Sequence, residues 1–220
     1  MLANLIVILV NFIPILIAII LHEIAHGYTA YKLGDDTAKR FGRLSLNPIR
    51  HIDPFGTIIL PALLYYSGVG FLFGWAKPVP VNFSKLKSNR DMLLVASAGI
   101  IVNIFLALAS AILLYLVDFF SAPMLQSIFG VFLINMVVYN IVLAVFNLLP
   151  IPPLDGSKIF FGWINKPWAQ KYVNSEHAGL LTIIGIAFIL PVIGRQLHID
   201  LNLFGWYMIN VSKFFISMLI

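Results

Sequence analysis

The sequence predicts an all-α membrane protein, and three observations indicate this class. Of its 220 residues, 60% are hydrophobic and only 10% are charged, whereas soluble domains carry about a quarter charged residues. The mean hydropathy is +0.96. Several apolar runs approach the roughly 20 residues that a membrane-spanning helix needs. Because the sequence shows no internal repeat and no low-complexity linker, residues 1–220 are expected to form a single membrane-embedded domain.

Five apolar segments are expected to span the membrane as helices: about 4–32, 92–118, 125–149, 178–194 and 203–220. The first segment lacks the basic N-terminal region of a cleaved signal peptide, so it is interpreted as a retained helix. A sixth apolar stretch, 57–75, is interrupted by proline and glycine. We therefore expect about five to six transmembrane helices, with a re-entrant or hairpin segment near 57–82.

The positive charges indicate how the chain sits in the bilayer. Most Lys and Arg residues fall in three regions, 32–50, 77–90 and 158–171, which the positive-inside rule places in the cytoplasm. Two of these regions flank 57–75, so that stretch is expected to enter the membrane and return; a true crossing with basic flanks is the alternative. The net charge of +5 is interpreted as a topology signal. The expected partner is the lipid bilayer, with no nucleic acid.

The stretch KPVPVN at 77–82 cannot be helical, because Pro78 and Pro80 each remove a backbone donor. The alternation of Val79 and Val81 suits an extended edge strand. An interfacial linker is the alternative, and composition alone favours it.

Three ionisable residues interrupt the first apolar segment in the motif HEIAH. His22 and His26 are four residues apart, so both imidazoles lie on one helix face and can reach one zinc ion. Glu23 is rotated about 100° from His22, which suits a general base beside the metal. Helix–helix hydrogen bonding is the alternative, but it does not explain three ionisable groups at this depth.

A catalytic zinc site usually has three protein ligands and an open fourth position. The chain has no cysteine, so the third ligand must be His, Asp or Glu. His51, His177 and His198 lie in polar or interfacial segments. Asp155 follows three prolines in NLLPIPPLDG, where LDG resembles a turn that presents a carboxylate. Its alternative role is to cap a helix that starts near residue 156.

HEIAH on an early helix, together with the distal NLLPIPPLDG, resembles the site-2 protease family of intramembrane zinc metalloproteases. RFGRLSLNPIRHIDPFGT at 40–57 and GWAKPVPVN at 74–82 are also similar to its compact bacterial and archaeal members. The resemblance extends to about residue 160 and includes no PDZ-like insertion. It implies that His22, His26 and Asp155 bind one Zn²⁺ per chain and that Glu23 activates water.

Two asparagines are candidates for binding the substrate or the transition state. Asn103 lies in a G-x-x-x-N pattern that starts at Gly99, and Asn147 opens the NLLPIPPLDG motif. Their amides could donate to an oxyanion, or they could form hydrogen bonds between helices. Gly99 is expected to allow close helix packing. His51 is included in the resemblance but has no assigned mechanism.

The expected function is therefore an intramembrane zinc endopeptidase that hydrolyses peptide bonds in or near the transmembrane segments of substrate proteins, as in regulated intramembrane proteolysis. The protein is expected to be multi-pass and to lie in a prokaryotic cell membrane. A membrane metal transporter or scaffold is the alternative, and a metal-to-protein ratio above one would favour it.

Overall fold

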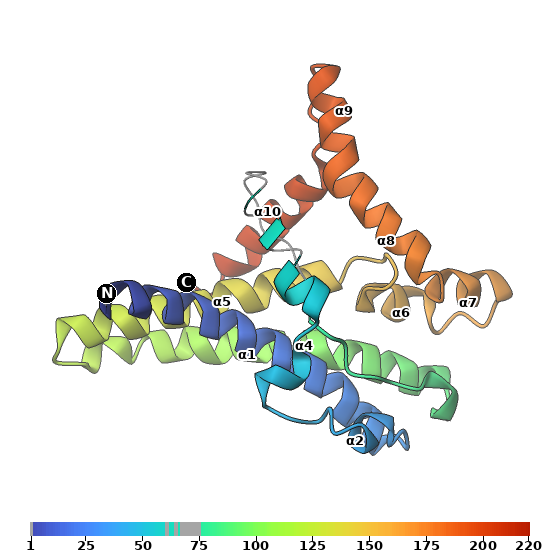
Figure 1. The fold of residues 1–220 in the computed structure, drawn as a ribbon, viewed down its shortest axis with the longest axis horizontal. Coiled ribbons are helices and arrows are strands. Elements are labelled where there is room, and N and C mark those ends of the chain that lie inside the picture. Colours follow the sequence, from blue (N-terminus) through green and yellow to red (C-terminus); the bar gives the residue numbers. More distant parts are fainter. Residues whose placement is uncertain (1, 60–61, 64–65, 67–75) are drawn as a thin grey trace.

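The computed structural model describes residues 2–59, 62–63, 66 and 76–220, and these residues form an all-helical fold. Its longest helices are α1 (Leu2–Lys32), α4 (Asn89–Leu114) and α5 (Pro123–Asn147), which pack side by side as a bundle (Figure 1). The expected helices at 4–32, 92–118 and 125–149 are thus confirmed, and the all-α membrane class is correct.

Local sequence explains where the bundle helices begin. The Ser88 hydroxyl accepts from the backbone N–H of Asp91, so Ser88 is the N-cap of α4. Pro123 occupies the first turn of α5, where its missing N–H costs nothing. The prolines after Leu149 prevent α5 from continuing. Pro14 lies inside α1 and is fully buried against its neighbours, which is how membrane helices tolerate proline.

The core of the bundle is made of small and branched side chains. Ala107 and Ala111 of α4 pack against Val137, Ile141 and Val145 of α5. Small residues let two helix backbones approach closely where lipid gives no hydrophobic driving force. Helix α10 (Leu203–Ile216) packs on this core through Tyr207, Met208 and Val211.

Among the described residues, four helical segments are long and apolar enough to cross a membrane: Leu5–Lys32, Asn89–Phe119, Pro123–Asn147 and Glu176–Gln196. The fourth contains α8 (Glu176–Ile184), a π-helical stretch (Gly185–Ile189) and α9 (Leu190–Gln196), and it runs away from the bundle (Figure 1). The expected helix at 203–220 is present as α10, but its 14 residues extend only about 21 Å at 1.5 Å per residue. A bilayer core is about 30 Å thick. The structure therefore confirms that this segment is helical, but not that it spans the membrane.

Short elements connect these helices. Around α1 and α4 they are α2 (Thr37–Arg40), a 3-10 turn (Pro48–His51), a π-helical turn (Pro54–Ile59) and a 3-10 turn (Phe83–Lys85). Between the later helices they are a 3-10 turn (Val117–Phe119), α6 (Asp155–Phe161) and α7 (Pro167–Val173). Residues 76–82 form no strand, which agrees with the interfacial linker that composition favours for 77–82.

Hydrogen bonds join the regions on either side of 57–75. The Asn82 N–H donates to Asp35 Oδ2 over 2.6 Å, and the Lys77 N–H donates to the His51 carbonyl over 2.8 Å. Arg43 Nη2 donates to the Lys77 carbonyl over 2.7 Å. The two basic regions therefore meet near the C-terminal end of α1, which supports their expected location on one side. The path between them lies largely outside the described residues.

Candidate metal centre

His22 and His26 occupy successive turns of α1 and are both buried. Their ring centroids are 4.6 Å apart with the rings nearly perpendicular, and their Nε2 atoms are 3.0 Å apart. The four-residue spacing thus brings two imidazole nitrogens to one point, as the motif predicts.

Asp155 reaches the same point from α6. Its Oδ2 lies 3.3 Å from His22 Nε2 and 3.1 Å from His26 Nε2. Asp155 is the first residue of α6, after Leu154 as N-cap, and no side chain caps this helix. The turn folds tightly onto the end of α5, because a Cβ at Gly156 would collide with the carbonyl oxygens of Leu148 and Leu149. Only glycine fits at this position.

The protonation pattern makes the three converging atoms a ligand set. His26 Nδ1 lies 2.7 Å from the Val95 carbonyl, which can only accept, so Nδ1 carries a proton, and in the neutral imidazole Nε2 is left with a lone pair. Asp155 Oδ2 is buried and has no hydrogen-bond partner.

The distances suit a metal ion. The three ligand atoms all lie within 4.8 Å of one another, and no other such group occurs in the described part of the chain. Ligand atoms about 2.0 to 2.1 Å from a tetrahedral zinc ion lie roughly 3.3 Å apart. The observed separations of 3.0, 3.1 and 3.3 Å are close to this value. His22, His26 and Asp155 could therefore hold a zinc ion.

Gly99 of α4 makes room for the two imidazoles. A Cβ at this position would lie 2.5 Å from His26 Nε2 and 2.6 Å from His22 Cε1. This geometry agrees with the expectation of close packing at Gly99. The side chains that Gly99 contacts are the two candidate ligands, His22 and His26.

Glu23 is partly buried and faces the segment that precedes α4. Its Oε2 accepts the backbone N–H of Val79 over 2.7 Å. Val79 itself is buried against α1, where a Cβ at Gly27 would lie 2.6 Å from Val79 Cγ1. Because Gly27 has no side chain, the 77–82 segment can pack against α1 beside Glu23, the candidate general base.

Asn103 is fully buried at the same site. Its Oδ1 lies 2.6 Å from His22 Nδ1, and its Nδ2 donates to Asn140 Oδ1 over 2.8 Å and to the Ala18 carbonyl over 3.3 Å. Both N–H directions of Asn103 therefore point at protein acceptors. This is the bonding between helices that the sequence left open as the alternative to substrate binding.

Asn147 and His51 make hydrogen bonds to backbone carbonyls. The Asn147 amide donates to the Leu143 carbonyl of its own helix over 3.0 Å and is partly buried. His51 is buried, and its Nε2 bonds the Ser45 carbonyl over 2.8 Å. His51 does not belong to the group of converging ligand atoms.

The sequence did not identify two groups that contact candidate site residues, the Asn140 side chain and the Val79 N–H. Asn140 of α5 is fully buried and bonds Asn103; its signal was an amide in the middle of an apolar helix, a position where polar groups are usually bonded to other helices. The Val79 N–H was missed because a backbone donor has no signal in the sequence.

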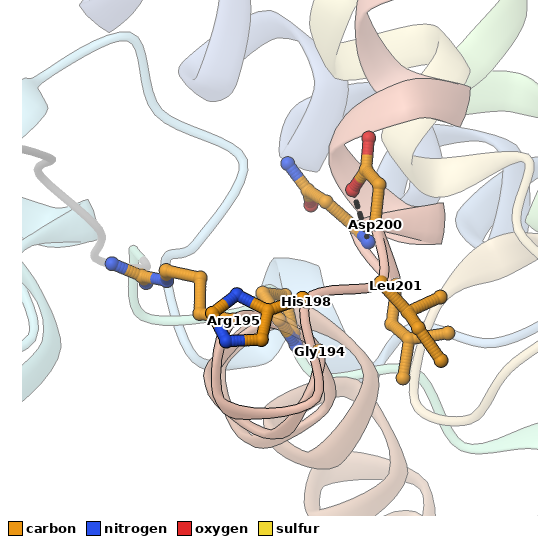
Figure 2. A pocket seen from close by; sticks show the side chains of 8 residues that line it. Gly194, Arg195, His198, Asp200 and Leu201 are labelled. Atoms are coloured by element: carbon orange, nitrogen blue, oxygen red, sulfur yellow. Dashed lines mark hydrogen bonds between the residues drawn. The ribbon is translucent and has the colours of Figure 1, made fainter.

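An open hollow of about 500 Å³ lies elsewhere, between α9 and α10 (Figure 2). Arg195, His198 and Asp200 line it and are exposed, and Asp200 accepts from the Asn202 N–H over 3.0 Å. None of the candidate site residues lines this hollow.

Comparisons with known proteins indicate the family of the chain. A family model described as "Peptidase family M50" matches residues 116–192. A relative from Bacillus subtilis (strain 168), named "Putative zinc metalloprotease YwhC", is 40% identical over 91% of this chain and 86% of its own length. Two relatives named "Putative zinc metalloprotease Rip2" are less similar. The Mycolicibacterium smegmatis protein is 29% identical over 82% of this chain, and the Mycobacterium tuberculosis H37Rv protein is 31% identical over 81%. Each is covered over 66% of its own length. No solved structure matches significantly.

Proposed function

The chain belongs to peptidase family M50 and is a metalloprotease, and we propose that it is an intramembrane zinc endopeptidase. Its substrates are membrane proteins, cleaved in or near their transmembrane segments as in regulated intramembrane proteolysis. The apolar helices around the candidate site support this proposal, because a site built between α1 and α4 lies among segments long enough to cross a bilayer. Bacterial relatives support a prokaryotic cell membrane as its location.

One observation carries the proposal: two imidazole nitrogens and one carboxylate oxygen, all from largely buried residues, converge on one point. His22 Nε2, His26 Nε2 and Asp155 Oδ2 lie 3.0 to 3.3 Å apart, and all three are acceptors when each neutral imidazole is protonated on Nδ1, as its contact there favours. Acceptors at this distance repel unless a cation lies between them, and burial increases the cost. His22, His26 and Asp155 would hold one zinc ion per chain, which would satisfy all three atoms.

In the proposed reaction, the metal ion and Glu23 have separate roles. A zinc ion held by these residues would supply Lewis-acid chemistry: it would polarise the scissile carbonyl and lower the pKa of water. Glu23 is assigned as the general base: one carboxylate oxygen is held by Val79, and the other, Oε1, takes the proton of the attacking water. Glu23 then delivers that proton to the leaving amine, so the carboxylate is regenerated.

Substrate geometry follows from the same site. A helical substrate hides its carbonyls in hydrogen bonds, so it must unwind locally before cleavage. We interpret the 57–82 region as its docking surface. Along 77–80 the Lys77 and Val79 N–H groups already bond the protein, and Pro78 and Pro80 have none. An extended substrate that pairs with residues 77–80 could therefore bond them only through its own N–H groups, which would donate to the backbone carbonyls of these residues.

The test uses the purified protein in detergent with a model transmembrane substrate. The wild type should bind about one zinc per chain and cleave, and Glu23→Gln should keep the zinc but lose cleavage by roughly 10²- to 10⁴-fold. The exposed Glu176 is the only other glutamate, so Glu176→Gln is the matched control and should behave as the wild type. Undiminished cleavage by Glu23→Gln contradicts the proposal. Several metal ions per chain without cleavage favour a transporter.

A further inference from the structure

A chain of buried hydrogen bonds runs from α5 through α4 to His22. The Asn140 amide donates to the Met136 carbonyl over 2.8 Å, and Asn140 Oδ1 accepts from Asn103 Nδ2 over 2.8 Å. Asn103 Oδ1 then lies 2.6 Å from His22 Nδ1. Asn103 and Asn140 have 0% exposed surface, so water cannot replace any member of this chain.

The Met136 carbonyl, at the α5 end of this chain, determines which group donates in each hydrogen bond. The Met136 carbonyl can only accept, so Asn140 turns its NH₂ group there and its oxygen toward Asn103. Asn103 must then present its NH₂ group to Asn140 and to the Ala18 carbonyl, which leaves its own oxygen facing His22. An oxygen acceptor at that point requires the His22 proton on Nδ1, and the Nε2 lone pair is then free.

We propose that Asn103 and Asn140 are positioning residues that hold His22 in its metal-binding tautomer, with Asn140 acting through Asn103. This inference rests on the proposed zinc site. Histidine ligands commonly donate their other ring N–H to a fixed acceptor, and loss of that acceptor typically costs 10- to 100-fold in metal affinity. The inference also gives Asn103 a role other than binding the substrate, since both directions of its NH₂ group are used inside the protein.

The two histidines differ in how they are oriented. His26 donates to the Val95 carbonyl, a backbone acceptor that no side-chain substitution removes and that cannot rotate. Once Asn140 no longer accepts from it, Asn103 is held only by the longer 3.3 Å bond to the Ala18 carbonyl, and a half-turn would bring its NH₂ group to His22 Nδ1. The His22 proton would move to Nε2 and block the metal position. Substitution of Asn140 should therefore act on His22 and leave His26 unchanged.

The test compares two substitutions of similar size at Asn140. In Asn140→Leu the acceptor is lost, and zinc affinity measured by chelator competition should fall about 10- to 100-fold. In Asn140→Asp a protonated carboxyl can donate to the Met136 carbonyl and accept from Asn103, so zinc affinity should stay within about threefold of the wild type. Asn135→Leu is the control, because Asn135 also joins α5 to α1 through Val10 and Asn11 but does not contact the ligands.

A second measurement does not depend on how any variant folds. In the metal-free wild type, ¹⁵N spectra of the histidine rings should show His22 protonated at Nδ1. A spectrum with His22 protonated at Nε2 overturns the inference. So does wild-type zinc affinity in folded Asn140→Leu. If the wild type itself binds no zinc, the proposed function fails, whatever the Asn140 variants do.

Discussion

The backbone N–H of Val79 donates to the Glu23 carboxylate over 2.7 Å, which joins two residues that are 56 positions apart in the chain. Pro78 and Pro80 have no N–H, so Val79 supplies the only donor among these three residues. The contact holds one oxygen of the proposed general base in a fixed place. It also fastens the 77–82 segment to the side of α1.

Replacing Glu23 should therefore change the mobility of this segment in a way that depends on the new side chain. In Glu23→Leu the Val79 amide loses its acceptor, and hydrogen bonds to charged groups contribute about 1.5 to 3 kcal/mol. We expect its hydrogen exchange to accelerate about 10- to 100-fold. Glu23→Gln keeps an amide oxygen as acceptor and should retain most of the protection.

The measurement is hydrogen exchange resolved to single amides. The Asn82 amide serves as an internal control, because it donates to Asp35 and not to Glu23. Equal exchange of the Val79 amide in the Leu and Gln variants would show that Glu23 does not hold this segment.

Gly99 should be essential for metal binding although it is no ligand. A Cβ there would lie 2.5 Å from His26 Nε2, so Gly99→Ala must displace the imidazoles. We expect zinc affinity to fall by about tenfold or more. Gly130→Ala is the matched control: the nearest atom to its Cβ is Val117 Cγ1 at 3.8 Å, and alanine favours a helix by up to roughly 1 kcal/mol. Chelator competition on both variants checks this, and equal zinc affinities would contradict it.

The sequence predicted the helical part of the fold well, because apolar runs in a membrane protein are unambiguous. The expected helices at 92–118 and 125–149 lie within a few residues of α4 and α5. The segment at 203–220 was harder, since a long apolar run does not reveal that the helix ends at Ile216. The expectation of a re-entrant segment at 57–75 falls largely outside the described residues.

At the candidate site, the sequence could identify the side chains but not their distant contacts. The spacing of His22 and His26 fixes their common helix face, so their proximity was predictable. Asp155 depended on resemblance, because no local pattern specifies which helix end folds back onto α1. Asn140 and the Val79 N–H depend on how α5 and the 77–82 segment pack, which spacing alone does not determine.

The two basic regions around 57–75 should face the same side of the membrane. Hydrogen bonds from Asn82 to Asp35 and from Lys77 to His51 join them in the structure. Ser45→Cys and Ser84→Cys, introduced separately into this cysteine-free chain, should both react with an impermeant reagent added to the cytoplasmic side.

Ser121→Cys provides the control for this labelling. It lies in the exposed turn between α4 and α5 and should react from the opposite side. Labelling of the Ser45 and Ser84 variants from opposite sides would mean that 57–75 crosses the membrane.

The zinc content of purified Asp155→Ala tests the central claim most directly. Asp155 supplies the only carboxylate oxygen among the three converging ligand atoms, so its loss should remove much of the metal affinity. Elemental analysis of folded, detergent-solubilised protein should find far less than one zinc per chain in Asp155→Ala and in His22→Ala, with proteolysis lost in both. The exposed Asp118→Ala control should retain about one zinc. Full zinc and normal cleavage in Asp155→Ala would contradict the account and would make His51 the first alternative ligand to examine.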